Sequence, residues 1–216
     1  MLRITKVTFT YKNKISQVLV LILVMLFTSP LVFTQSHSIM SYNIRYDNEW
    51  DKVNSWEIRR DEVIKLIYEY DPGIIGIQEG LLNQVRYIKN ALNNYDYFGV
   101  GRDDGKDKGE FCSIFYDRTR YDLQKSSTFW LSETPGEISV GWDAALERIC
   151  TYGLFFDKKE GQDFWVFNTH FDHIGSIARE KSAELILKKI ASLNYRSLPV
   201  ITVSYTHLRA HETSTD

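Results

Sequence analysis

The chain has 216 residues, of which 44% are apolar, 14% aromatic and 25% charged. This composition fits one globular domain with a sizeable core and excludes a disordered chain, a collagen-like repeat and a small disulfide-stapled scaffold. The formal net charge is −2, and it becomes −6 once the four basic residues of 1–34 are set aside, since 22 basic and 28 acidic residues remain. Proteins that grip nucleic acid non-specifically present a net basic surface, so an acidic chain does not favour nucleic acid as a partner.

The first 34 residues have the composition of a secretory signal peptide. Their only charges are basic, and an unbroken apolar decamer, 18–27, is followed by Thr28, Ser29 and Pro30. An uncleaved membrane anchor is the alternative interpretation. It is less favoured, because a helix needs about 20 apolar residues to cross a bilayer and this decamer is shorter. We therefore predict a signal peptide over 1–34 and export to the periplasm or the extracellular space. The membrane is then a partner only through this segment, and no stable protein partner is implied.

Hydrophobic patterns along the rest of the chain predict strands and three helices. Strands are expected over 38–46, 73–78, 95–100, 111–116, 121–129, 148–156, 164–169 and 198–202. Helices are expected over about 54–70, over 81–92 and, after His170, around 183–193. Helices that bracket a β-rich middle argue for a layered α/β or α+β fold.

Two polar residues stand at or near the ends of predicted strands. Glu79 leaves the buried strand 73–78, where a carboxylate could either carry chemistry or cap the helix that follows. Asn43 lies within the first strand, and a buried amide there needs hydrogen-bond partners, which could be backbone groups alone. Each residue is ambiguous when it is taken by itself.

The segment 168–173 (NTHFDH) is richer in chemistry, because two histidines and an aspartate are costly to bury as core filling. A polar turn in which Asp172 caps the next helix is one interpretation. Another is the zinc motif of metallo-β-lactamases, which His170, Asp172 and His173 match. Asn168 stands where that motif has its first histidine, and losing this ligand weakens a zinc site.

A further interpretation covers more of the chain. Several short segments occur in the order and rough spacing of one family: 40–46 (MSYNIRY), 76–79 (GIQE), 101–106 ahead of 109–110, 129–132, 142–143 before Arg148, and 168–170 (NTH). Residues 37–202 thereby resemble the endonuclease/exonuclease/phosphatase family, the deoxyribonuclease-I-like superfamily of metal-dependent phosphoesterases. The resemblance implies a four-layer αββα sandwich with the active site at one rim of its two sheets.

The resemblance also implies roles for individual residues. Glu79 would be the carboxylate ligand of a catalytic Mg²⁺ or Mn²⁺, and hard oxygen ligands with open water positions suit Mg²⁺. Asn43 would stand beside it, either in contact with the metal or in support of its ligand. His170 would hydrogen-bond the scissile phosphate and stabilise its developing charge. Asn168 and Asp172 would support this catalytic group.

Three basic residues are expected to bind the phosphate or the substrate. Arg148 would help His170 and the metal at the phosphate. Arg102 and Lys106 belong to the charged, glycine-punctuated loop 101–110, which would line the substrate mouth. A solvated turn is the alternative interpretation of this loop.

The family pattern continues beyond this chain's last predicted strand, with Gly-Asp-x-Asn and later an Asp-His pair that activates the attacking water. The chain has instead the segment 203–216, which shows no apolar periodicity. We therefore predict 35–202 to be the N-terminal portion of the family domain and 203–216 to be a non-native tail. The missing late strands make the expected sandwich incomplete, and we expect this chain, as a fragment, to be inactive.

Three functions remain open at this point. The leading one is a phosphoesterase that works outside the cytoplasm on a phosphate ester which the sequence does not identify. The alternatives are a zinc-dependent hydrolase of the metallo-β-lactamase type and a non-catalytic extracellular binding module on the same fold, which would use Trp130, Trp142 and Tyr152. Asn43, Glu79 and His170 together favour the enzyme, because a binding module has no need of this trio.

Overall fold

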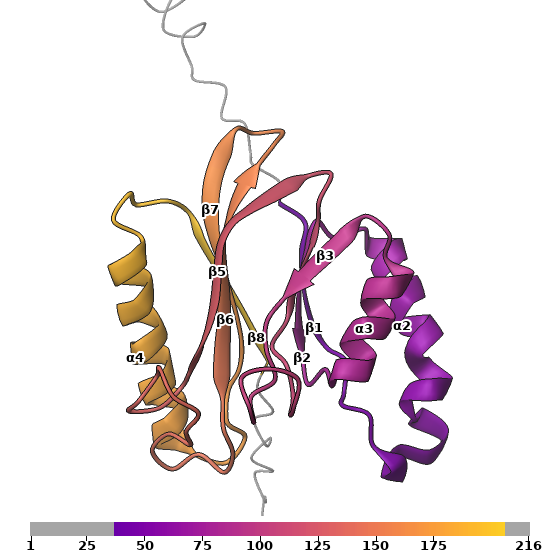
Figure 1. The fold of residues 1–216 in the computed structure, drawn as a ribbon, viewed down its shortest axis with the longest axis horizontal. Coiled ribbons are helices and arrows are strands. Elements are labelled where there is room, and N and C mark those ends of the chain that lie inside the picture. The colour runs from indigo at the N-terminus through magenta and orange to yellow at the C-terminus, as the bar shows by residue number, and fades with distance from the viewer. Residues whose placement is uncertain (1–36, 206–216) are drawn as a thin grey trace, which may run out of the picture. The chain divides into compact units, whose positions relative to one another are not determined.

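Two four-stranded sheets face each other in the computed structural model, which describes residues 37–205 (Figure 1). The first sheet has the order β1-β2-β4-β3, with β1 Ile39–Asn43, β2 Ile74–Gln78, β3 Tyr95–Phe98 and β4 Ile114–Asp117. The second has the order β5-β6-β7-β8, with β5 Tyr121–Trp130, β6 Ile149–Asp157, β7 Gln162–His170 and β8 Val200–Tyr205. Both sheets are mixed, since β1 runs parallel to β2 and β7 parallel to β8, whereas the other neighbours are antiparallel.

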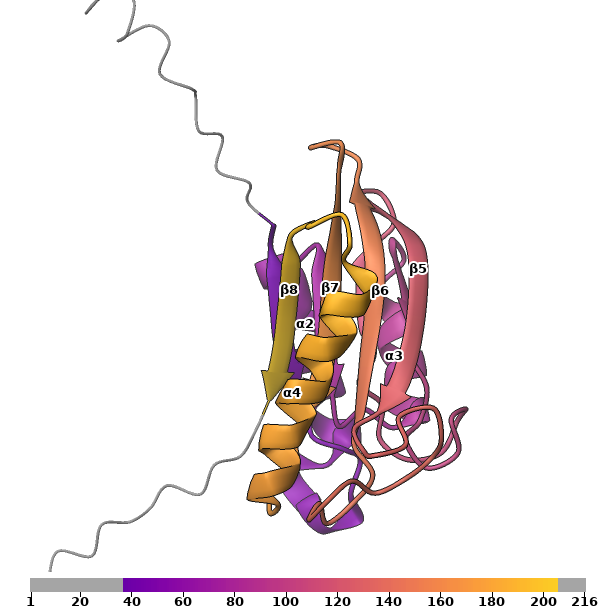
Figure 2. The same ribbon diagram turned by 90° about the vertical axis from the view of Figure 1, so that its left-hand side faces the viewer.

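Helices cover the outer face of each sheet. Figure 1 shows α2 and α3 beside the first sheet, and Figures 1 and 2 show α4 across the second. The bounds are α2 Trp56–Tyr70, α3 Leu82–Ala91 and α4 Ser176–Leu193. This arrangement confirms the predicted α/β (α+β) class and its four-layer αββα sandwich. One element was not predicted, the 3₁₀ helix η1 at Glu49–Asn54.

Hydrophobic side chains fill the three spaces between the four layers. Strand β2 is buried along its whole length because one face packs on helices and the other on the second sheet. The space between the helices and the first sheet holds Ile75, Ile77, Val85 and Ile88. The space between the sheets holds Ile74, Ile114, Phe155, Phe164 and Val166. The space under α4 holds Tyr152, Leu154, Trp165, Phe167 and Ile186.

The sheets approach each other most tightly at Gly76. A Cβ atom at this position would lie 2.4 Å from Cγ2 of Val203 and 2.9 Å from Oδ1 of Asn168. Val203 belongs to β8, which therefore continues to Tyr205, three residues beyond the predicted end of this strand. Three residues of the segment 203–216 thus pair with β7. The rest of that segment and the predicted signal peptide lie outside the described residues.

Asn168 of β7 is fully buried and joins the two sheets. Its Nδ2 donates to the carbonyl oxygens of Ile77 (2.8 Å) and Ser113 (2.9 Å), and its Oδ1 accepts from Nε2 of Gln78 (2.7 Å). These hydrogen bonds satisfy the buried amide, which would otherwise destabilise the fold.

Over residues 37–205, none of the helices combines the length and apolar character that crossing a membrane requires.

Candidate active site

A cleft of about 650 Å³ lies at the end of the sandwich where β2 and β7 finish. Because β6 runs antiparallel to β7, the residue before β6 reaches the same edge as the residue that ends β7. Glu79, Arg148 and His170 therefore meet although they are far apart in sequence. The cleft is lined by Arg45, Tyr46, Glu79, Arg102, Glu110, Leu146, Arg148, His170 and His173.

Glu79 is a buried carboxylate on the first-sheet wall of this cleft, with 7% of its surface exposed. Its backbone φ is +61°, a left-handed value uncommon outside glycine, so the fold holds it in this position against local strain. Nδ2 of Asn43 donates to Oε1 at 2.7 Å, the backbone N–H of Tyr46 donates to Oε2 at 3.4 Å, and Nε2 of His170 lies 3.4 Å from Oε1. Burial by itself raises the pKa of Glu79, but these donors more than offset it and lower the pKa to about 2.

Glu79 does not cap the helix that follows it, so that alternative is wrong. Helix α3 begins after Leu81, whose N–H donates to Oε1 of Gln84 at 3.0 Å. The carboxylate of Glu79 instead points at residues from β1 and β7. This leaves it available to the cleft as an ionised group.

Asn43 contacts Glu79 through its amide nitrogen. Its Oδ1 accepts from the backbone N–H of Arg45 at 2.9 Å, so the oxygen is engaged away from Glu79. A cation binds amide oxygen and not amide nitrogen. Of the two roles expected of Asn43, contact with the metal or support of its ligand, these hydrogen-bond directions favour the second, because the side chain orients the carboxylate.

His170 ends β7 with both ring nitrogens facing oxygen atoms. Nδ1 lies 2.6 Å from the carbonyl oxygen of Tyr205, and Nε2 lies 3.4 Å from Oε1 of Glu79. A carbonyl can only accept, so Nδ1 donates, and the imidazolium form satisfies both contacts. His170 is thus placed on the cleft as a hydrogen-bond donor, as the sequence predicts.

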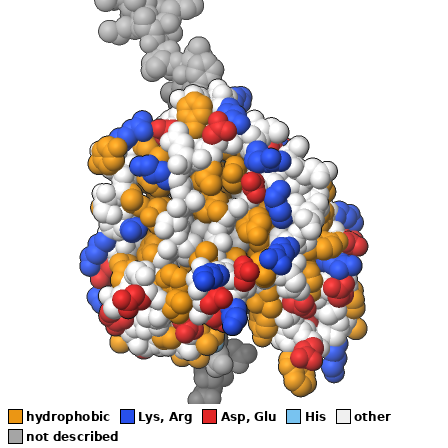
Figure 3. All heavy atoms as spheres, viewed as in Figure 1, with side chains coloured by type: hydrophobic (Ala, Val, Ile, Leu, Met, Phe, Trp, Pro, Cys, Tyr) orange, Lys and Arg blue, Asp and Glu red, His pale blue; other side chains and the backbone are white. Residues whose placement is uncertain are grey.

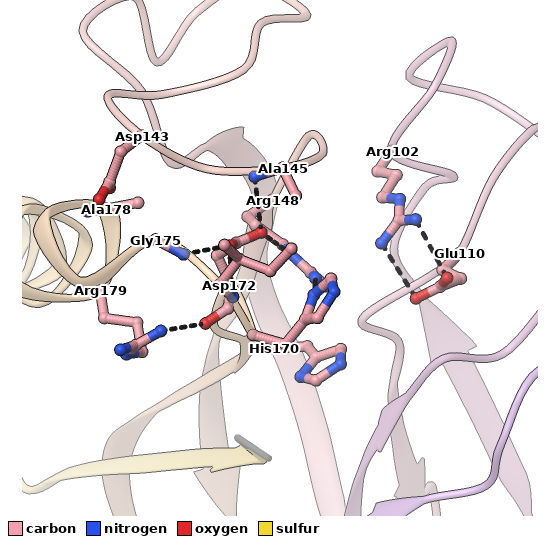
Figure 4. A network of polar contacts seen from close by, with 12 residues as sticks. Arg102, Glu110, Asp143, Ala145, Arg148, His170, Asp172, Gly175, Ala178 and Arg179 are labelled. Carbon is pink, nitrogen blue, oxygen red and sulfur yellow. Dashed lines mark hydrogen bonds and ion pairs between the residues drawn. The ribbon is translucent and has the colours of Figure 1, made fainter. Parts of the chain in front are cut away.

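Arg148 and Asp172 form a buried ion pair on the opposite wall (Figure 4), with side chains 5% and 1% exposed. Nε of Arg148 donates to Oδ2 of Asp172 at 3.2 Å, and Nη2 contacts Nδ1 of His173 at 3.0 Å. Asp172 also accepts the backbone N–H groups of Ala145, Ile174 and Gly175. Burial raises the pKa of Asp172, but these donors and Arg148 bring it below its ordinary value.

Asn168 and Asp172 are predicted site residues that do not line the cleft. Asn168 is fully buried between the sheets, and Asp172 faces Arg148 and backbone N–H groups. A side chain without access to the cleft cannot contact a substrate, so both residues can act only by positioning other groups, which agrees with the supporting role expected of them. Asp172 also accepts N–H groups of the turn before α4, as the polar-turn interpretation expects. It does not cap the helix, because the first N–H groups of α4, those of Ile177 and Ala178, donate to Asp143.

The two basic residues of loop 101–110 differ from each other. Arg102 lines the cleft, but its Nη1 and Nη2 both donate to the carboxylate of Glu110 at 3.0 Å, as Figure 4 shows. Its charge is neutralised by this bidentate pair. Lys106 is exposed and does not line the cleft. The expectation that Lys106 binds substrate is therefore corrected, because loop 101–110 turns it toward solvent.

The residues of the cleft fit Mg²⁺ or Mn²⁺ better than zinc. Between 37 and 205 no cluster of three or more histidine, cysteine, aspartate or glutamate residues could hold a metal ion. The zinc motif 170–173 does not converge, because His170 faces Glu79 whereas Asp172 and His173 both contact Arg148. Mg²⁺ often uses one or two carboxylates together with waters and substrate phosphate, and the single ionised Glu79 on an open cleft fits this pattern.

Comparison with known proteins adds solved structures of the same fold. No family model matches the sequence. A mannosyl-6-phosphatase from Bacteroides thetaiotaomicron is 44% identical, with a TM-score of 0.76 over 78% of this chain and 64% of its own. An endonuclease/exonuclease/phosphatase family protein from the same bacterium is 44% identical, with a TM-score of 0.77 over 79% and 63%. An uncharacterized protein of Acanthamoeba polyphaga mimivirus is 31% identical over 136 residues, which are 59% of this chain and half of the viral protein.

The fold and the cleft define a two-sheet sandwich protein with an ionised carboxylate, a histidine and an arginine at one rim. In fold and in sequence the chain is similar to proteins of the endonuclease/exonuclease/phosphatase family, which supports the superfamily that the sequence predicts. It spans less than two thirds of the length of the relatives described above.

Five cleft residues were not among the predicted site residues: Arg45, Tyr46, Glu110, Leu146 and His173. Arg45 and Tyr46 follow Asn43 within the first motif, and His173 ends the polar segment 168–173, so proximity to a motif was a usable signal. Glu110 stands in the motif segment 109–110, but its role is to pair with Arg102, a contact that only the folded loop creates.

Proposed function

We propose that this chain carries the metal-binding and phosphate-binding part of a Mg²⁺- or Mn²⁺-dependent phosphoesterase that works outside the cytoplasm. The observation that supports this most is the ionised, buried Glu79, with a pKa of about 2, on a cleft whose opposite wall carries Arg148. An anionic residue and a fixed cation on facing walls suit a phosphate bridging a divalent cation and a guanidinium.

The metal ion would be held by Glu79, and when bound it would supply a Lewis acid for a phosphoryl oxygen. Asn43 and the N–H of Tyr46 keep the carboxylate oriented. Arg148 carries one guanidinium nitrogen, Nη1, that neither of its two hydrogen bonds uses, so it can donate to a phosphate oxygen. His170 donates from the neighbouring strand, where it would stabilise charge that develops on the phosphate.

Sugar phosphate monoesters are the first substrates to test, because a relative at 44% identity is a mannosyl-6-phosphatase. Nucleic acid is not favoured. Acidic and basic side chains are interspersed over the face shown in Figure 3 and form no broad basic field there. Basic fields are what supply non-specific affinity for nucleic acid.

Binding measurements on the full 216-residue chain test the proposal. We expect Mn²⁺ to bind and to strengthen binding of inorganic phosphate, and Glu79→Gln to abolish both effects. Glu69→Gln, on the exposed face of α2, is the matched control and should change neither. Phosphate binding that ignores the metal would overturn the proposal in favour of the binding module, and coupling to Zn²⁺ alone would favour the zinc hydrolase.

Turnover is measured on the same proteins with mannose 6-phosphate. Phosphate release in Mg²⁺ or Mn²⁺ that is lost in EDTA and in Glu79→Gln would support hydrolysis and contradict the prediction that this chain is inactive. Metal-coupled phosphate binding without release would support the binding half of the proposal together with that prediction.

A further inference from the structure

The hydrogen bond between Arg148 and His173 determines which nitrogen of the histidine carries a proton. Arg148 can only donate, because a guanidinium has no acceptor and stays charged. Nδ1 of His173, 3.0 Å from Nη2 of Arg148, must therefore accept. The ring is then neutral with its proton on Nε2, and it presents one N–H donor of defined direction.

Buried contacts hold this arrangement in place. Arg148 is anchored through Nε to Asp172, and Asp172 is anchored by three backbone N–H groups and is almost fully buried. Figure 4 shows Asp172 against Arg148, with Ala145 and Gly175 donating from two different segments. His173 itself is exposed and lines the cleft. Nδ1 of the ring is thus held by Arg148, while the Nε2–H group is open to a ligand.

A neutral donor beside a charged one divides the recognition of a phosphate ester between two groups. Charged guanidinium N–H groups prefer phosphate oxygens, with which they form the stronger, charge-assisted hydrogen bonds. The uncharged N–H of His173 adds no net charge to attract a second anion and suits a hydroxyl or ether oxygen. Because His173 touches Arg148, a phosphate bound at Arg148 brings the alcohol part of the ester toward His173.

We propose that His173 is a specificity-determining residue that donates from Nε2 to a hydroxyl or ring oxygen of the alcohol part, and so selects phosphate monoesters of sugars over inorganic phosphate and unsubstituted esters. This inference rests on the proposed function, because it places the phosphate at Arg148. The residue acts on the organic part of the ligand and leaves the phosphate to Arg148 and to the cation that Glu79 would hold.

Calorimetric titration of the full chain, in Mn²⁺, tests this with two probes, mannose 6-phosphate and inorganic phosphate. His173→Phe should weaken binding of mannose 6-phosphate about tenfold, which corresponds to the loss of one hydrogen bond. The same variant should leave inorganic phosphate within about twofold. His173→Gln retains a side-chain N–H and should recover part of the preference, and Lys188→Gln, exposed on α4, is the surface control.

The outcomes separate this inference from the proposed function. If wild-type chain binds neither probe, both are overturned. If it binds both and His173→Phe weakens them equally or not at all, only the role of His173 is overturned. Nitrogen NMR of the ring gives a readout that a merely structural role would not move. We expect an Nε2–H tautomer in the wild type and a tautomer mixture in Arg148→Met, which has no donor at this position, and a wild-type Nδ1–H tautomer would contradict the inference.

Discussion

Two arginines reach the cleft from opposite walls, and their guanidinium groups do different things. Arg102, in the loop before β4, gives both Nη atoms to Glu110. Arg148, before β6, gives Nε to Asp172 and Nη2 to His173, which leaves Nη1 for a ligand. The comparison teaches that the number of cations on a cleft does not measure its capacity for anions. Each arginine engages two guanidinium nitrogens, so what matters is which nitrogen remains: Arg102 keeps only its buried Nε, whereas Arg148 keeps Nη1.

The largest expected effect concerns the anchor of the second arginine. Asp172→Ala leaves the buried guanidinium of Arg148 without its carboxylate, and breaking a buried pair in this way costs about 3–5 kcal/mol of unfolding free energy. Chemical denaturation measures it. Asp122→Ala, which breaks the exposed Lys158–Asp122 pair, is the control and should cost less than about 1 kcal/mol. Equal losses would show that the Arg148 anchor is no stronger than a surface pair.

Glu79 offers a contrast, because the strongest partners of its carboxylate are His170 and the uncharged amide of Asn43 instead of an arginine. Its folded pKa of about 2 lies below the ordinary 4.5, so its stabilisation is fully present above about pH 4.5 and is lost as the pH falls toward 2. The shift corresponds to no more than about 3 kcal/mol. In EDTA, the unfolding free energy of wild type should fall faster with acid than that of Glu79→Gln, and parallel curves would contradict the shift.

Exchanging each arginine for methionine tests the comparison directly. Arg148→Met should weaken binding of inorganic phosphate about 10- to 100-fold, because a hydrogen bond to a charged group contributes about 1.5–3 kcal/mol. Arg102→Met should weaken it less than about threefold, since its donors serve Glu110. Titration in Mn²⁺ measures both, with circular dichroism as the control for folding. Similar losses in the two variants would break the comparison.

The smallest effect is expected at Lys106, which shares its loop with Arg102. Its side chain is exposed and away from the residues that line the cleft. Lys106→Ala should therefore leave phosphate binding within about twofold, at low salt as well as at high salt. A fivefold loss in the same titration would show that Lys106 contributes to phosphate binding, as the sequence-based expectation has it.

Periodicity predicted the elements better than it predicted contacts. All eight strands and three helices were foreseen, because alternation and helical spacing report which faces are buried. The 3₁₀ helix η1 was missed, since such a short segment buries no side chain and leaves no pattern. Strand β4 starts at Ile114 instead of 111 because Phe111 pairs only in isolated bridges with Gly80 and Gly101.

The site was predictable where a residue's own chemistry decides its role. Glu79, His170 and Arg148 line the cleft as expected, because they stand at strand ends that share one edge. The roles of Asn43, Asn168 and Lys106 were less predictable, since a hydrogen-bond direction, a sheet-to-sheet contact and a loop conformation decide them. None of these is encoded in local sequence.

Asn168 has a consequence for how the sandwich moves. Its three hydrogen bonds connect β7 to two segments of the other sheet, so the sheets cannot shear past each other without breaking all three together. His170, which lines the cleft, lies two residues after Asn168 in the same strand. Local breathing of the sandwich is thereby coupled to the geometry of the cleft, and backbone amides of β2 and β7 should exchange with solvent hydrogen only through global opening.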